Sequence, residues 1–431
     1  MGGIVNMQMG RGMVRWLRKE RIPFVLLAML CSFCITFEHA VSKSSINSLF
    51  ISHYGAKNFP LAWIVSLPIN LFVVASYNRF INTLGAFRFL LGIMAATMGV
   101  NALLAYGGAT YAPLAFLMGV WKDIYVLLLF QQLWSIIHSS SNQKESHSLY
   151  GVLFGVGGVG SVVGSLIPGF FAVSLGSSHL LFFCLPIGAL LATAYLFLLR
   201  QSGVREDISP RGQWADAWEG FALIRSSPTL RYILMIVLFM QVSATLMDLK
   251  YNAYLGVEFP NQDLRTQFSG RLWSCVNGCN FLLQFFAAFA LVRWVGERRT
   301  HLALPIILLG LVVQSACMSS FFVTACCFAA LKVFDYSIFN IMKEWLYVPM
   351  RQEEKFKAKA VIDVFIYRAA KGIAAIGWFC TQGLARWIGA IDAMSVVSWL
   401  IVAMHIGWLG GVLLFLRKRN TSASSQPTLS S

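Results

Sequence analysis

Long apolar runs recur along the whole chain, and they constrain its fold more than any other feature. About twelve such runs, each roughly 20 residues long, are separated by polar connections. A run of this length lets one helix cross the hydrocarbon core of a bilayer, where only helices and closed barrels satisfy every backbone polar group. Charged residues make up 12% of the chain, against about 25% in soluble domains. The sequence therefore predicts an all-α polytopic membrane protein with about 12 transmembrane helices.

The runs fall into two sets of six around the longest polar connection. The spans expected in the first set are 22–41, 60–77, 88–108, 113–137, 150–173 and 179–199. Those expected in the second set are 230–250, 271–292, 302–321, 323–342, 361–385 and 394–416. Six plus six spans are the layout of major-facilitator transporters, in which two halves rock about a central site.

This division predicts five parts. They are a basic N-terminal tail (1–21), a six-helix half (22–199), a cytoplasmic linker (200–229), a second six-helix half (230–416) and a disordered polar tail (417–431). Within the linker, Trp214, Trp218 and Phe221 recur at helical spacing. This pattern predicts a short amphipathic helix at the membrane interface.

The formal net charge of +16 is distributed unevenly between the two predicted sides of the membrane. With the N-terminus inside, 24 of the 34 Lys and Arg residues fall on cytoplasmic segments, six on outward loops and four inside spans. This bias predicts that both termini are cytoplasmic. Topology therefore explains most of the charge, and a nucleic-acid partner is not expected.

Motifs of soluble enzymes do not fit this chain. Gly155, Gly157 and Gly160 match GxGxxG, but that motif needs a preceding strand and here lies in an apolar span. With Gly164, two of these glycines instead form a flank of small residues that lets another helix approach closely. An intramembrane enzyme or lipid-handling scaffold would need a nucleophile and base, or metal ligands, at one depth, and the sequence offers no such set. We expect neither an enzyme nor a metal or organic cofactor.

The densest group of charges lies in residues 332–372, around the tenth and eleventh spans. Lys332 and Asp335 are three residues apart, so they share a helix face and can pair. Arg368 and Lys371 have the same spacing, with only Asp363 nearby in that span. Because a cation in hydrocarbon costs roughly 2.5–3.5 kcal/mol, the surplus positive charge indicates an anionic substrate. Pairing with another helix is the alternative.

Weaker charge signals have two interpretations each. Lys122 either faces a cavity or pairs locally with Asp123. Lys250, with Asp248, is expected to reach the outer interface from the end of its span, as is Lys43 with Glu38. Topology and lipid phosphates explain the basic loop residues equally well, and these are Arg351, Lys355, Lys357 and Lys359.

The same region resembles the nucleotide transporter family of intracellular bacteria and plastids, the ATP/ADP antiporters. The family pattern is similar to YSLFD-x-x-KE-x-x-Y-I-P-L followed by KxKAxxDV-x-x-x-R-x-x-K. The matching residues are Tyr336, Lys343, Glu344, Tyr347, Pro349, Lys357, Lys359, Asp363, Arg368 and Lys371. Asn340 stands where the family has aspartate before KE.

Two other stretches extend this resemblance. The seventh span resembles the family's S-P-Y-L-R opening and implies that Asp248 stands for a glutamate near the outer end. SKSSINSL stands where the family has RDTKDTL, and Lys43 is the counterpart of its arginine. The resemblance implies a secondary transporter of the bacterial inner membrane that exchanges nucleotides, such as ATP and ADP, by alternating access.

We therefore predict two sets of site residues. The substrate-binding set is Arg368, Lys371, Lys122, Lys332 and Tyr336. The charge-pairing or gating set is Asp363, Asp335, Lys343, Glu344, Asp248 and Lys43. The cations would attract phosphates, and Tyr336 or Trp121 would stack on a base. The alternative function is transport of another organic anion (a sugar phosphate, cofactor or peptide), with or without proton symport. The expected partners are a small anionic substrate and the lipid bilayer.

Overall fold

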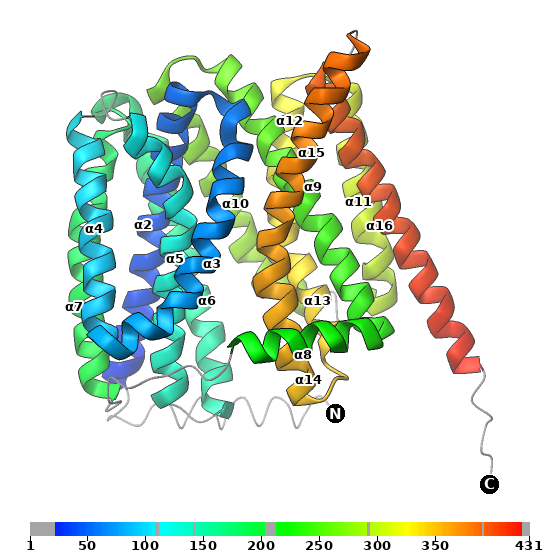
Figure 1. The fold of residues 1–431 in the computed structure, drawn as a ribbon, viewed down its shortest axis with the longest axis horizontal. Helices are drawn as coiled ribbons and strands as arrows, with labels where there is room; N and C mark the ends of the chain where they lie inside the picture. The colour runs from blue at the N-terminus through cyan, green and yellow to red at the C-terminus, as the bar shows by residue number, and fades with distance from the viewer. Residues whose placement is uncertain are drawn as a thin grey trace. The chain divides into compact units, whose positions relative to one another are not determined.

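The structure, a computed structural model, describes residues 22–107, 112–140, 143–202, 213–290, 294–389 and 392–424. Every regular element in these ranges is helical (Figure 1). Ten of the described helical segments are long and apolar enough to cross a membrane. The other two predicted spans, 271–292 and 361–385, coincide with helices that carry more polar residues. The predicted basic tail 1–21 lies outside the described residues.

The chain forms two compact units, and we describe each by itself. Unit 1 consists of Met1–Gly55, Pro68–Pro210 and Phe259–Phe281. Unit 2 consists of Ala56–Leu67, Arg211–Glu258 and Leu282–Ser431. Two helices contribute to both units, α3 (Phe59–Leu84) and α10 (Gln262–Ala290). In α3 the division falls at Pro68, which has no N–H to donate to the helix.

Unit 1 is built around α2 (Ile22–Tyr54), which packs against α5, α6 and α7. The bounds of its other helices are α4 (Ala86–Gly107), α5 (Ala112–Ser140), α6 (Gln143–Leu175), η3 (His179–Phe183) and α7 (Cys184–Ser202). Leu129, Leu133 and Leu153 are buried with the first turns of α2 in one apolar cluster. Burial of these side chains fixes α2 at the centre of unit 1.

The glycine flank of α6 confirms the packing interpretation of that motif. A Cβ atom at Gly164 would lie 2.5 Å from the carbonyl oxygen of Phe37, and one at Gly160 would lie 2.6 Å from that of Phe33. The Ser32 hydroxyl of α2 donates to the Leu153 carbonyl of α6 at 2.9 Å. Only glycine allows this close crossing of two helices.

Several helices extend further than the apolar runs predict. α2 continues to Tyr54, so the SKSSINSL segment is helical and Glu38 lies buried in mid-helix. α9 (Pro228–Glu258) likewise continues past Lys250. The interpretation of Lys250 as a lysine that reaches the interface from a helix end is wrong, because its side chain is only 1% exposed.

Unit 2 is built around α9, which packs against α12, α15 and α16. The bounds of its other helices are η1 (Ala56–Asn58), α8 (Gln213–Ser226), α11 (Glu297–Cys317), α12 (Phe321–Phe334), α13 (Asn340–Tyr347), α14 (Gln352–Lys359), α15 (Tyr367–Ile388) and α16 (Ala393–Ser424). α8 falls in the linker and lies across the helix ends of unit 2, beside α9 and α14 (Figure 1). α16 keeps the first residues of the predicted tail 417–431 helical as far as Ser424.

Among the described elements of unit 2, two π-helical segments each connect two α-helices. The first, η5 (Asp335–Phe339), joins α12 to α13, and the second, η6 (Ala360–Ile366), joins α14 to α15. Each contains one of the predicted site aspartates, Asp335 in η5 and Asp363 in η6. π-helical turns are rare and are found frequently at functional sites.

Candidate functional site

Lys343 and Asp363 form the central ion pair of the candidate site in unit 2. The Lys343 ammonium donates to the Asp363 carboxylate at 2.9 Å, and the two side chains are 6% and 28% exposed. Lys343 Nζ also lies 3.4 Å from the Tyr367 hydroxyl and 5.1 Å from the centroid of its ring. The contact joins α13 to η6 and to the first residue of α15. Lys343, predicted on the cytoplasmic connection, and Asp363, predicted in a span, are therefore direct partners.

A second ion pair links α13 to α14. The Lys359 ammonium donates to both carboxylate oxygens of Glu344, at 2.5 and 2.7 Å. It also lies 5.2 Å from the centroid of the Tyr347 ring. The Lys359 and Glu344 side chains are 28% and 45% exposed, so water screens this pair more than the first. Lys359, for which the sequence suggested topology or lipid phosphates as explanations, thus has a specific partner in Glu344.

Asp335 is the most buried carboxylate of the site and opens the first π-helical segment. Its carboxylate accepts a hydrogen bond from the Gln241 amide of α9 at 2.8 Å. Lys332 and Lys343 also interact electrostatically with it. The expectation that Lys332 acts on Asp335 across one helical turn is consistent with this arrangement. Gln241, in the middle of α9, is the partner that the sequence did not indicate.

The remaining predicted residues of unit 2 lie on α9, α12, η5 and α15. Arg368 and Lys371 are half-buried on one flank of α15, one turn apart. Tyr336 is half-buried in η5, and its backbone carbonyl accepts a bond from the Gln284 amide of α10 at 3.1 Å. Lys332 Nζ lies 5.8 Å from the centroid of the Phe328 ring. Asp248 accepts a bond from the Asn252 amide at 2.8 Å.

Lys122 and Lys43 belong to unit 1. The Lys122 side chain is buried, and its ammonium donates to the Gly119 carbonyl of the same helix at 3.0 Å. Lys43 Nζ lies 3.4 Å from the centroid of the Trp273 ring on α10. This cation–π contact replaces the interface-reaching position expected for Lys43. A binding role for either lysine remains a prediction.

Two buried cations were missed by sequence reasoning. The Lys250 ammonium of α9 donates to the Ser315 carbonyl at 2.6 Å and to its hydroxyl at 3.0 Å. The Arg265 guanidinium of α10 donates to the Ser48 carbonyl at 2.8 Å and to the Ser52 hydroxyl, both on α2. Both residues lie beside apolar runs, which was the indication that the sequence offered. The count of Lys and Arg on each side of the membrane instead assigned both to an outward loop.

Sequence comparisons match a family model to the segment that contains the ion pairs and several carriers to longer parts of the chain. The family model TLC ATP/ADP transporter matches residues 315–416. The ADP,ATP carrier protein 1 of Chlamydia pneumoniae is 25% identical over 212 residues, which are 44% of this chain and 41% of that carrier. This alignment therefore spans less than half of either protein. The chloroplastic ADP,ATP carrier protein 1 of Arabidopsis thaliana is 21% identical over 90% of this chain and 73% of its own length.

Solved transporter structures share the fold. A mutant of the nucleoside transporter NupG superposes with a TM-score of 0.62 at 12% identity, over 91% of this chain and 99% of that one. A bacterial homologue of the human lysosomal transporter Spinster, solved inward-facing and unoccupied, superposes with a TM-score of 0.53 at 13% identity, over 91% and 94% of the two chains. At such identities the likeness concerns the fold alone.

The ten apolar helices, the transporter fold and the matches to ADP,ATP carriers agree with one another. They indicate a multi-pass membrane protein with a major-facilitator-like fold. The family match covers α12 to α16, including both π-helical segments and both ion pairs. Over residues 315–416 the chain is thus similar to the TLC ATP/ADP transporter family.

Proposed function

We propose that this transporter exchanges nucleotides across the bacterial inner membrane by alternating access, with both termini in the cytoplasm. The observation that carries the proposal is the charge balance of unit 2. Asp335, Asp363 and Glu344 are each engaged by a neighbouring side chain. Among the residues that the structure describes, no carboxylate lies within ion-pair distance of Arg368. An anionic ligand is the partner that its guanidinium lacks.

A phosphate chain suits this arrangement. Arg368 offers a planar set of donors that matches phosphate oxygens, and Lys371, one turn further along the same flank, adds a point charge. Phosphate oxygens can also take over the ammonium of Lys343 or Lys332 when an aspartate releases it. The aspartates then hold the cations apart and oriented while no substrate is bound. In this proposal Tyr336, in η5, supplies an aromatic surface for the base.

The names of the relatives support nucleotides as the substrate class. The Chlamydia and Arabidopsis proteins are ADP,ATP carriers, and the match to their family covers α15 with Arg368 and Lys371. Exchange of one nucleotide for another needs no coupling ion. Another organic anion, such as a sugar phosphate, would use the same cations. Uptake of each candidate substrate therefore has to be measured.

Transport by reconstituted protein tests the proposal. Liposomes preloaded with ADP should accumulate labelled ATP, and empty liposomes should not. A panel of nucleoside mono-, di- and triphosphates, with sugar phosphates as competitors, defines the substrate. If no nucleotide is taken up or competes while another organic anion does, the nucleotide proposal is wrong and the alternative stands.

Substitution of Arg368 tests the residue assignment separately. Arg368→Gln should raise the half-saturating nucleotide concentration roughly tenfold or more, because a hydrogen bond to a charged group contributes about 1.5–3 kcal/mol. Arg386→Gln is the matched control, since Arg386 is an exposed arginine on the same helix that donates to the Gln382 side chain at 3.4 Å. Equal transport by both variants would remove Arg368 from the site.

A further inference from the structure

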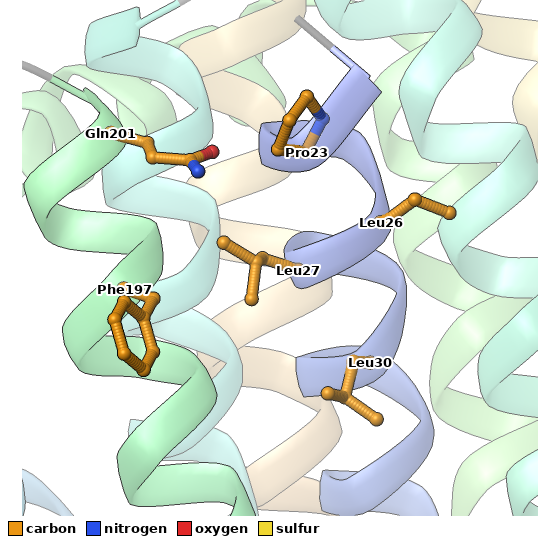
Figure 2. Close-up of a pocket in the computed structure, with 6 residues that line it drawn as sticks. All are labelled: Pro23, Leu26, Leu27, Leu30, Phe197 and Gln201. Atoms are coloured by element: carbon orange, nitrogen blue, oxygen red, sulfur yellow. The ribbon is translucent and has the colours of Figure 1, made fainter.

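An apolar groove lies on unit 1. It is formed between the start of α2 and the end of α7 and has a volume of about 380 Å³ (Figure 2). Its lining residues are Pro23, Leu26, Leu27, Leu30, Phe197 and Gln201. Five of these six side chains are purely apolar. Leu26 and Phe197 are 56% and 47% exposed, so the groove is open to its surroundings.

The two ends of the groove differ in polarity. Pro23 and Gln201 lie together at one end, as Figure 2 shows, and both are at the limits of their predicted spans. Leu30 is seven residues further along α2, which corresponds to roughly 10 Å at 1.5 Å per residue. The groove thus begins at a membrane interface, on the predicted cytoplasmic side, and continues into the hydrocarbon layer.

The polar end of the groove carries positive charge. The Arg200 guanidinium lies 5.8 Å from the centroid of the Phe197 ring, which lines the groove, and its side chain is exposed. Gln201 adds an amide next to it. A basic side chain beside an apolar groove at this depth matches the charge of an anionic lipid head group.

We propose that this groove binds an anionic phospholipid, with an acyl chain along α2 and α7 and the phosphate at Arg200. An acyl chain is favoured over a peptide because the lining offers hydrogen-bond partners only at Gln201. An extended peptide would leave its backbone N–H and C=O groups unsatisfied in hydrocarbon, at several kcal/mol each. An acyl chain has no such groups. The site is independent of which substrate the transporter carries.

Native mass spectrometry of the full chain tests this proposal. Protein extracted from membranes with equal phosphatidylglycerol and phosphatidylcholine should retain phosphatidylglycerol selectively. Arg200→Gln should lower the retained amount about fivefold, the factor that corresponds to about 1 kcal/mol per basic residue at an anionic surface. Leu27→Trp, which fills the groove, should abolish retention of both lipids.

Matched controls separate this site from general lipid contact. Arg231→Gln removes an exposed arginine at the start of α9 in unit 2, and Leu414→Trp enlarges an exposed leucine of α16. Both controls should retain phosphatidylglycerol like the unmodified protein. Equal retention by Arg200→Gln, Leu27→Trp and the controls would overturn the proposal, as would equal retention of the two lipids by the unmodified protein.

A photo-crosslinking side chain in place of Leu26 identifies the occupant directly. The adduct expected at this exposed position is a phospholipid. If the adduct is instead peptide 1–21 of this chain, or a second copy of the protein, the groove is a protein-docking surface and the lipid proposal is wrong.

Discussion

Among the described residues of unit 1, the buried guanidinium of Arg265 donates to neutral oxygens, whereas in unit 2 the buried ammonium of Lys343 donates to the carboxylate of Asp363. Arg265 is 2% exposed and Lys343 5% exposed, so burial does not distinguish them. The partners do. Carbonyl and hydroxyl groups hold Arg265 as a fixed brace between α10 and α2. A carboxylate and an ammonium can each accept another charged partner, and this makes the pair in unit 2 suitable for binding and release of an anion.

The contrast extends to the backbone around each cation. Arg265 lies in the first turns of a regular α-helix. Lys343 lies eight residues after the start of a π-helical segment, and Asp363 lies within another. π-helical turns are rare and are found frequently at functional sites, so the backbone also distinguishes the charged pair of unit 2 from Arg265.

The largest loss of stability is expected from Asp363→Asn. The substitution keeps the shape of the side chain but leaves the Lys343 ammonium buried without its counter-charge. Breaking a buried pair from one side costs 3–5 kcal/mol, and we expect about 3 kcal/mol because Asp363 is 28% exposed. Thermal unfolding in detergent measures the loss. The double variant Lys343→Gln/Asp363→Asn should recover most of it, and a double variant as unstable as the sum of the single ones would show that the two charges are not coupled.

A smaller loss of stability is expected from Arg265→Gln. Glutamine is too short to reach the Ser48 and Phe259 carbonyls, and a lost partner for a buried polar group costs about 1–3 kcal/mol. The matched control is Arg271→Gln, since Arg271 is exposed on the same helix and bonds to the Gly169 carbonyl. The control should change stability by less than about 0.5 kcal/mol. Equal melting temperatures for the two variants would show that Arg265 is not a brace.

The smallest effect is expected from Lys359→Gln, which breaks the more exposed ion pair with Glu344. Pairs of this exposure contribute about 0.2–1 kcal/mol. High salt should remove the difference in melting temperature between Lys359→Gln and the unmodified protein, because dissolved ions screen the attraction between exposed charges. The Asp363→Asn difference should persist in the same salt. If salt suppresses both differences equally, the Lys343–Asp363 pair is not protected from solvent and the comparison between the two ion pairs fails.

The residues of the candidate site were largely predictable, but their partners were not. Helical spacing placed Arg368 and Lys371 on one flank of α15, and the family pattern selected Lys343, Glu344 and Asp363. Lys343 and Asp363 are separated in the sequence by the whole of α14. The hydrogen bond from Gln241 to Asp335 joins residues that are 94 positions apart. Spacing along one helix says nothing about which other helix lies opposite. The groove at Phe197 could not be predicted for the same reason, because it is formed by two helices that are far apart in the sequence.

The sequence by itself determined the fold class, because a bilayer core admits few structures and apolar runs of helical length report that constraint directly. It also determined where the charge is concentrated. Only the tertiary structure decided which charged residues are buried. Hydropathy treats each residue as if it faced lipid or water, so Lys250 and Glu38 were expected at helix ends. Inside a bundle a neighbouring helix supplies partners, as Ser315 does for Lys250, and the helix continues through the charge.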